Sequence, residues 1–230
     1  NKLFIYSVPS NLEKQIVFYK RVLVPFGHRQ LKGFIIEEAF FAEIENLKKI
    51  KDIIKVLDTE PVIQKDLLEL SQWMADYYIC SYGEVLNSIV PDLNIKKKVN
   101  NHPQSISIFK PPIILTEEQK TVLNSIYSSI EKNNFASFLL HGVTGSGKTE
   151  IYVQAIKYLI ENKKKQAIVL LPEISLTPQI IQYFKDYFGE KISVWHSHLS
   201  SGEKADEWKK IKNGEVDIVI GARSAIFAPF

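Results

Sequence analysis

A glycine-rich segment that ends in lysine and threonine is the part of the sequence best suited to chemistry. Residues 142–149 are Gly-Val-Thr-Gly-Ser-Gly-Lys-Thr, which fits the pattern G-x-x-x-x-G-K-[ST] at every position. The glycines let successive backbone N–H groups point at phosphate oxygens. Lys148 can then bind the β- and γ-phosphates and the Thr149 hydroxyl can bind Mg²⁺, so ATP with Mg²⁺ is the predicted ligand and these two residues are the predicted catalytic groups. The predicted nucleotide-binding residues are Gly142, Val143, Thr144, Gly145, Ser146, Gly147, Lys148 and Thr149.

Strands and helices are predicted in alternation around this loop. The apolar run 135–140 predicts a buried strand directly before the loop, and a helix is predicted from residue 148 to residue 161. Further strands are predicted at 167–171, 191–195 and 216–220, and further helices at 116–132, 178–188 and 201–212. Alternation at these lengths is typical of a parallel sheet with helices on both faces. The second half of the chain is therefore predicted to be an α/β domain.

Two polar segments follow strands of this predicted sheet. Residues 171–179 (Leu-Pro-Glu-Ile-Ser-Leu-Thr-Pro-Gln) follow the second strand, and residues 221–230 (Gly-Ala-Arg-Ser-Ala-Ile-Phe-Ala-Pro-Phe) follow the fourth. Open α/β sheets bind ligands at the carboxyl ends of their strands, so both segments are candidates for a binding surface. Thr177 with Pro178 also predicts a helix start, whose N–H groups suit a DNA phosphate. Capping and phosphate binding are compatible there.

The first half of the chain has a different pattern. Short apolar runs separated by turn residues between residues 1 and 36 predict a small sheet or barrel, and residues 51–57 predict one more strand. Helical spacing follows over 62–78, where we expect the aromatic side chains, Trp73 included, to be core residues. Residues 94–112 have no periodicity and are typical of a linker. The predicted domains are therefore 1–93, β-rich with a helix (α+β), and 113–230.

Composition limits the class of protein. The net charge is +3, and the lysines cluster at 48, 49 and 51, at 96–98 and at 163–165. Only three arginines occur, which favours contact with a nucleic-acid backbone over recognition of base edges. The single Cys80 excludes an internal disulfide and a multi-cysteine zinc site in these residues, and His196 with His198 lacks a further ligand cluster. No run of 18 apolar residues occurs, so a cytoplasmic protein without a membrane segment is expected.

The α/β half resembles the PriA family of superfamily 2 DNA helicases, whose motor domains are RecA-like. Its motif I matches 142–150, motif Ia matches 172–179 and motif Ib matches 221–230, in order and at the family's spacing. The resemblance adds Glu150 to the nucleotide-binding residues and implies that Gln119 contacts adenine. Thr116 with Gln119 also fits a helix capping box, and both roles stay open for Gln119. By the resemblance, the residues that contact single-stranded DNA through its backbone are Pro172, Thr177, Arg223 and Ser224.

The first half resembles, more loosely, the 3′-DNA-end-binding domain of the same family. Its landmarks are Phe-Ile-Tyr-Ser-Val-Pro at 4–9, Arg-Val-Leu-Val-Pro-Phe-Gly at 21–27 and Val-Leu-Asp-Thr-Glu-Pro at 56–61. The family's pocket for the terminal nucleotide maps onto Phe4, Ile5, Gly27 and Lys51. Ile5 stands where the family has an aspartate, so the resemblance implies stacking on Phe4 and phosphate attraction to Lys51 without that carboxylate.

The resemblance implies an ATP-dependent 3′-to-5′ DNA helicase that restarts stalled replication forks. Its expected cofactors are ATP and Mg²⁺, and its expected partners are single-stranded and forked DNA with 3′ ends, primosome proteins and single-stranded-DNA-binding protein. The family's winged-helix domain, Asp-Glu-x-His motif, arginine finger and zinc-binding cysteines do not occur in these residues. We therefore expect an N-terminal part of such a helicase, inactive alone, with zinc only in the remainder. The alternatives are a non-catalytic DNA-end-binding module and another P-loop enzyme, such as a kinase or a different superfamily 2 translocase.

Overall fold

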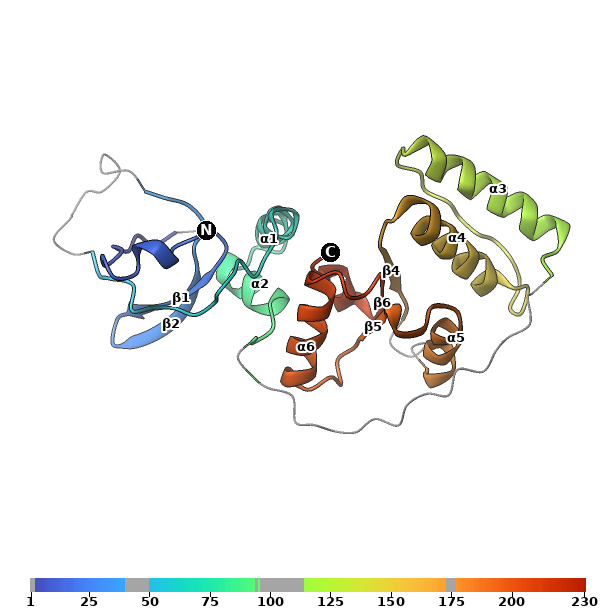
Figure 1. The fold of residues 1–230 in the computed structure, drawn as a ribbon. Coiled ribbons are helices and arrows are strands. Elements are labelled where there is room, and N and C mark those ends of the chain that lie inside the picture. The colour runs from blue at the N-terminus through green and yellow to red at the C-terminus, as the bar shows by residue number, and fades with distance from the viewer. Residues whose placement is uncertain (1–2, 40–49, 94, 96–113, 173–176) are drawn as a thin grey trace. The chain divides into compact units, whose positions relative to one another are not determined.

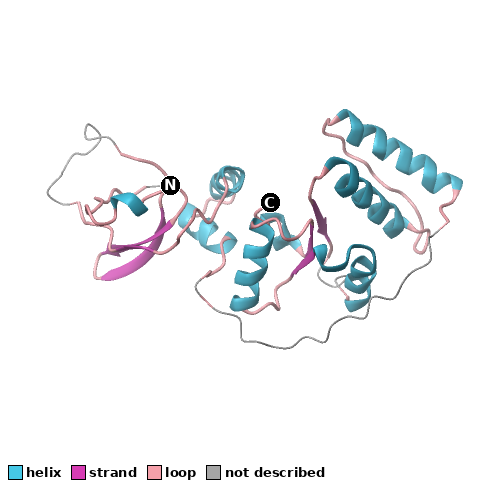
Figure 2. Ribbon diagram, in the orientation of Figure 1, coloured by secondary structure: helices cyan, strands magenta, loops and turns pink. Residues whose placement is uncertain are grey.

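The computed structural model describes residues 3–39, 50–93, 95, 114–172 and 177–230 (Figure 1). Contacts within the chain divide it into two compact units, Asn1–Pro91 and Asp92–Ala228, each with its own sheet (Figure 2). All of the predicted linker 94–112 except residue 95 lies outside the described residues, as do the lysine clusters at 48–49 and 96–98. Within the described part of the chain, no helix combines the length and the apolar character that crossing a bilayer requires.

The first unit contains a small antiparallel sheet. Strands β1 (Arg21–Phe26), β2 (Arg29–Phe34) and β3 (Lys55–Val56) lie in the order β2-β1-β3. β1 and β2 form a hairpin in which Phe26 pairs with Arg29, and Gly27 adopts a φ of 60° in the turn between them. Glycine suits this position because a side chain is strained at positive φ. The predicted β-rich fold of this half is confirmed.

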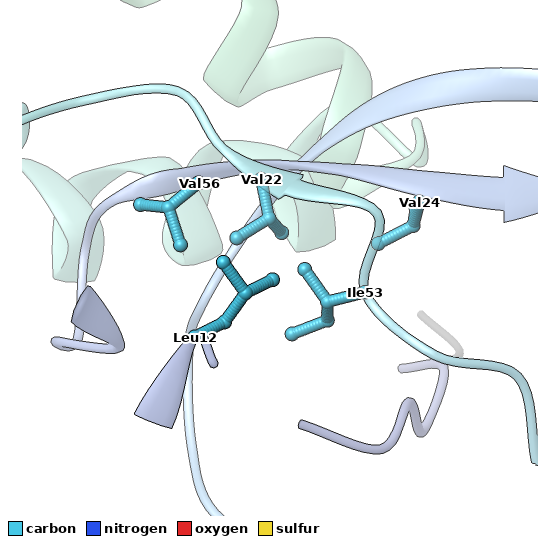
Figure 3. Packing of buried hydrophobic residues seen from close by; sticks show 5 residues of the cluster. All are labelled: Leu12, Val22, Val24, Ile53 and Val56. Atoms are coloured by element: carbon cyan, nitrogen blue, oxygen red, sulfur yellow. The ribbon is translucent and has the colours of Figure 1, made fainter. Parts of the chain in front are cut away.

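One face of this sheet carries the unit's core. Leu12, which precedes the 3-10 helix η1 (Glu13–Gln15), packs with Val22 and Val24 of β1, Ile53 and Val56 (Figure 3). Val22 and Val24 are two residues apart, so both side chains project from the same face of the strand. Helix α1 (Lys65–Tyr77), which confirms the helix predicted over 62–78, is followed by α2 (Tyr82–Ile89), which was not predicted.

The prediction that the aromatic side chains of residues 62–78 are core residues is wrong. Trp73, Tyr77 and Tyr78 are 55%, 65% and 63% exposed, and the rings of Trp73 and Tyr77 stack with their centroids 5.0 Å apart. The buried residues of α1 are instead Leu67, Ser71 and Ala75, spaced four apart along one face. Residues 73 and 77 lie two positions beyond 71 and 75, about 200° further around the helix. The helix therefore has two stripes at helical spacing, and the smaller side chains form the buried one.

The second unit is built around a parallel sheet, as predicted. Its strands lie in the order β4-β6-β5. Along the chain its elements are α3 (Glu117–Lys132), α4 (Lys148–Lys163), β4 (Ala167–Leu170), α5 (Pro178–Phe188), η5 (Gly189–Lys191), β5 (Ile192–Trp195), α6 (Ser201–Lys212), β6 (Ile218–Gly221) and η6 (Arg223–Phe227).

Helices cover both faces of this sheet. Val153 of α4 and Phe184 of α5 pack against Ile192, Ile218 and Ile220 on one face. Because side chains alternate along a strand, Ser193 and Trp195 of β5 project from the other face. There the Ser193 hydroxyl donates a hydrogen bond to Glu207 of α6 at 2.7 Å, and the Trp195 ring lies 6.0 Å from the ring of Trp208. The α/β prediction for this half is confirmed.

The buried strand predicted at 135–140 is not found. This segment joins α3 to α4 without pairing to any described strand, and Phe135, Phe138 and Leu139 are 99%, 51% and 94% exposed. An apolar run indicates that its side chains avoid water, but a strand also needs a hydrogen-bonded neighbour. The sequence pattern contains no information about that neighbour, and among the described strands β4, β5 and β6 pair only with one another.

Candidate nucleotide and DNA sites

The glycine-rich loop 142–147 leads directly into α4. Gly145 and Gly147 both adopt a φ of 81°, and Gly147 is the N-cap residue of the helix. A side chain at either position would be strained, which explains why the turn uses glycine. The first N–H groups of an α-helix have no acceptor within the helix, so the start of α4 presents donors to an anion. The loop is exposed, and Thr149 lies half-buried in the first turn.

The Lys148 side chain folds back onto the start of this loop. Its ammonium group donates hydrogen bonds to the carbonyl oxygens of Gly142 at 2.6 Å and Val143 at 2.7 Å. A bound phosphate offers the same ammonium group charged acceptors, with which hydrogen bonds are roughly twice as strong as with neutral ones. The loop glycines and Lys148 therefore fit a nucleotide phosphate, and Thr149 is positioned at the helix start from which its hydroxyl would hold Mg²⁺. With a nucleotide bound, Mg²⁺ would neutralise charge developing on the phosphates.

Gln119 connects the start of α3 to the loop. The predicted capping box is confirmed: the Gln119 N–H donates to the Thr116 hydroxyl at 3.2 Å, and the Thr116 N–H donates to Gln119 Oε1 at 3.0 Å. The amide nitrogen of the same side chain donates to the carbonyl oxygen of Ser146 at 3.4 Å. A Cβ at Gly147 would lie 2.3 Å from that nitrogen, so any other residue there would displace the end of the Gln119 side chain. Contact between Gln119 and adenine stays a prediction.

Glu150 faces the neighbouring helix. Its residue is 4% exposed, and its carboxylate accepts hydrogen bonds from the hydroxyls of Tyr183 and Tyr187, the latter at 2.9 Å, and from Gln154 Nε2 at 2.6 Å. Burial, reinforced by the hydrogen bond to Glu150, raises the pKa of the Tyr183 phenol, and burial also raises the pKa of Tyr187. Both phenols therefore stay protonated donors at neutral pH. The two tyrosines were missed in the sequence, where their spacing of four residues on a predicted helix was the available indication.

Three of the four predicted DNA-contacting residues lie at the carboxyl ends of the parallel strands β4 and β6. Pro172 follows β4, and Arg223 and Ser224 open η6 directly after β6; all three residues are exposed. The strand ends are adjacent because the Leu171 N–H donates to the carbonyl oxygen of Gly221 at 2.9 Å. Thr177 caps α5 as predicted, with its hydroxyl accepting from the Ile180 N–H at 3.4 Å. Residues 173–176 of this segment lie outside the described residues.

Gly221 allows the chain to turn at this edge. A Cβ at this residue would lie 2.1 Å from the carbonyl oxygen of Trp195 and 2.7 Å from the Cβ of Ala225. The first of these atoms belongs to the neighbouring strand β5, so it cannot move without disturbing the sheet. Arg223 and Ser224 therefore depend on a glycine for their position.

We expect Gly221→Ala to destabilise the second unit by about 1–3 kcal/mol, the ordinary cost of an extra methyl group in a closely packed site. Urea unfolding followed by tryptophan fluorescence measures this, since Trp195 and Trp208 are buried in that unit. Gly83→Ala is the matched control, because nothing lies within 4 Å of the added carbon. In the helix α2 it should stabilise the first unit by roughly 0.5–1 kcal/mol. An unchanged urea midpoint for Gly221→Ala would contradict the close approach between Gly221 and the carbonyl oxygen of Trp195.

The predicted end-binding residues gather around the β1–β2 turn of the first unit. Lys51 Nζ donates to the carbonyl oxygen of Gly27 at 3.5 Å. Phe4 contacts Phe26, next to Gly27, edge to face, with ring centroids 5.2 Å apart and an interplanar angle of 88°. Phe4 is 58% exposed and Phe26 44% exposed, so the pair offers aromatic surface beside a lysine. Phe26 was missed in the sequence, although an apolar residue directly before a turn glycine was an available indication.

Family models match both halves of the chain. The model described as "3′DNA-binding domain (3′BD)" matches residues 1–91, and the model described as "DEAD/DEAH box helicase" matches residues 116–230.

Among similar proteins, the replication restart protein PriA of Treponema pallidum is 34% identical over 233 residues, covering 100% of this chain and 35% of that protein. PriA of Bacillus subtilis is 52% identical over 136 residues, covering 58% of this chain and 17% of that protein. PriA of Rickettsia felis is 34% identical over 226 residues, covering 98% of this chain and 33% of that protein. The chain thus spans about a third of the length of the relatives that it matches throughout. The chain belongs to the DEAD/DEAH box helicases and, among them, to the family of the replication restart protein PriA.

Proposed function

We propose that this chain supplies the nucleotide site and part of the DNA surface of an ATP-dependent 3′-to-5′ DNA helicase. In this proposal the helicase recognises stalled forks and starts primosome assembly for replication restart, with primosome proteins and single-stranded-DNA-binding protein as partners. Residues 1–93 bind 3′ ends, 94–112 link the parts, and 113–230 begin the motor domain. Because the family's Asp-Glu-x-His motif does not occur in these residues, we expect them to bind ATP with little hydrolysis on their own.

One observation in the second unit carries the motor part of this proposal. Helix α4 begins in the phosphate-binding loop and packs on the same sheet whose carboxyl edge presents Pro172 and Arg223. A kinase needs the loop but has no use for a basic and polar edge suited to a nucleic-acid backbone. The test is simultaneous binding: the chain should bind ADP with Mg²⁺, and a single strand should bind without displacing it. A chain that binds DNA but no nucleotide would instead be the non-catalytic end-binding module.

The first unit should bind the end of a strand mainly through Phe4. Stacking of a base on an aromatic ring contributes about 1–3 kcal/mol, whereas a lysine–phosphate contact weakens as salt rises. We therefore expect Phe4→Ala to weaken binding of a single strand with a free 3′ end more than Lys51→Ala does at high salt. At low salt the difference should shrink or reverse. Fluorescence anisotropy over a salt series measures both.

The matched control for this prediction is Phe18→Ala, which removes another half-exposed aromatic ring of the same unit; its contact is with Tyr19. It should leave DNA affinity unchanged. A strand with a blocked 3′ end should bind more weakly than one with a free end. Equal affinities for free and blocked ends would mean that the surface around Phe4 and Lys51 does not recognise the end of a strand.

A further inference from the structure

A buried carboxylate joins the helix of the candidate nucleotide site to helix α5, whose N-cap Thr177 is one of the residues proposed to contact DNA. The Glu150 carboxylate of α4 accepts hydrogen bonds from Tyr183 and Tyr187 of α5, and both phenols reach the same oxygen, Oε2. We propose that Glu150 is a positioning residue that couples the two sites, so that a bound nucleotide changes the affinity for DNA. This inference rests on the proposed function, because it needs both ligands to bind.

At the nucleotide end, Glu150 belongs to the turn that forms the site. It directly follows Thr149, and its N–H donates to the carbonyl oxygen of Gly147 at 3.0 Å. A phosphate that replaces the carbonyl oxygens of Gly142 and Val143 as the partner of Lys148 changes the contacts of the first residue of α4. Glu150 lies two positions later in the same turn, so we expect its carboxylate to respond to this change.

At the DNA end, the two tyrosines lie on one face of α5, a single helical turn apart. The helix begins at Pro178 and is capped by Thr177, six positions before Tyr183, which is about 9 Å along the axis. A helix of this length moves as a rigid element, so a displacement at Tyr183 also displaces its N-terminus. Thr177, one of the residues proposed to contact the DNA backbone, lies at that terminus.

Hydrogen bonding makes this contact different from the apolar packing around it. Val153 of α4 and Phe184 of α5 lie in the same core cluster, and the hydrophobic stabilisation of this packing is non-directional. A buried carboxylate, in contrast, is costly unless its donors stay within hydrogen-bonding distance. The Glu150 contacts therefore require α5 to follow α4, which is the property that a coupling element needs.

The experiment measures how much DNA changes the affinity for ADP. Calorimetry gives the dissociation constant of ADP with Mg²⁺, alone and with saturating oligothymidylate of about 20 nucleotides, longer than ordinary single-strand site sizes. Coupling between ligand sites is typically about 5- to 150-fold, and we expect the unaltered chain to fall in this range. The paired change Tyr183→Phe and Tyr187→Phe keeps the rings and removes both hydroxyls. It should reduce the coupling factor, which is the ratio of the ADP dissociation constants without and with DNA, to about one. The affinity for ADP alone should stay within a few-fold of that of the unaltered chain.

Tyr158→Phe is the matched control. It lies on the same helix α4 and donates to a glutamate at 2.8 Å, but that glutamate is Glu131 of α3. Its coupling should equal that of the unaltered chain. The single changes Tyr183→Phe and Tyr187→Phe should each reduce the coupling, which keeps the test decisive if the paired change alters folding.

The outcomes separate this inference from the function on which it rests. An unaltered chain that binds both ligands without coupling overturns the inference, and so does coupling that survives the loss of both hydroxyls. In either case the proposed function stands. If the unaltered chain binds ADP or DNA but not both, the proposed function itself is wrong.

Discussion

Replacing Asp58 by alanine should destabilise the first unit by about 3–5 kcal/mol, the cost of leaving a buried charge without its partner. The partner is Arg21, whose guanidinium donates to both carboxylate oxygens of Asp58 at 2.7 and 2.9 Å. The side chains are 4% and 6% exposed, so water cannot replace the lost contacts. Asp58 also accepts the backbone N–H of Arg21 at 2.8 Å, so the change disturbs the start of β1. Hydrogen–deuterium exchange of the β1 amides, measured in the whole chain, gives the loss of stability locally.

Two further variants check the reason for this effect. Glu69→Ala removes an ion pair with Lys65 whose side chains are 67% and 75% exposed, and it should cost less than about 1 kcal/mol. Arg21→Met combined with Asp58→Leu removes both charges and should recover a large part of the stability lost in Asp58→Ala. If Asp58→Ala costs no more than Glu69→Ala, the pair is not buried as the structure has it.

Lys148→Ala should weaken binding of ADP with Mg²⁺ by about 10- to 100-fold. The variant loses hydrogen bonds between a charged donor and phosphate, which contribute about 1.5–3 kcal/mol, and about 1.4 kcal/mol corresponds to a factor of ten. In the unaltered chain the same ammonium group binds two loop carbonyls, so the variant also loosens the loop when it is empty. Calorimetric titration with ADP gives the ratio of dissociation constants.

Lys157→Ala is the control for this change. Lys157 lies on the same helix α4, and its side chain is 49% exposed near Glu161 at 4.0 Å. Removing it changes the net charge by the same amount but should leave the affinity for ADP within about twofold, since exposed charges are screened by salt. Equal affinities of the unaltered chain and Lys148→Ala would show that the loop does not bind phosphate.

Local features of this chain were predictable from the sequence because their causes are local. The capping box of Thr116 and Gln119 and the N-cap at Thr177 depend on a few adjacent residues, and both are confirmed. The predictions of a strand at 135–140 and of buried aromatic side chains on α1 were wrong, because both depend on which residues from elsewhere in the chain pair with the segment or pack against it. The contact between Glu150 and the α5 tyrosines was not predicted for the same reason, because it joins residues more than 30 positions apart.

The same difference between local and distant causes distinguishes the two candidate sites. The loop 142–149 was recognisable because all the residues of its phosphate-binding pattern lie in one continuous segment. The candidate end-binding site lies around the β1–β2 turn. There Phe4 contacts Phe26 and Lys51 contacts Gly27, so the site combines residues from separate segments of the chain. Only the resemblance to a known family connected Phe4, Gly27 and Lys51, and Phe26 was not included. Pattern arguments therefore locate sites that one segment builds and miss the partners that other segments contribute.

Strand β4 also bears on how copies of this chain behave in concentrated solution. Among the described strands it lies at one end of the order β4-β6-β5, and its Ile168 and Leu170 are 41% and 48% exposed. Such an edge is a template on which a strand of another copy can pair. Lys164 and Lys165 are exposed immediately before the strand, where two pairing copies would bring like charges together. Charges beside an apolar strand oppose aggregation, so we expect high salt, which screens the two lysines, to weaken that protection.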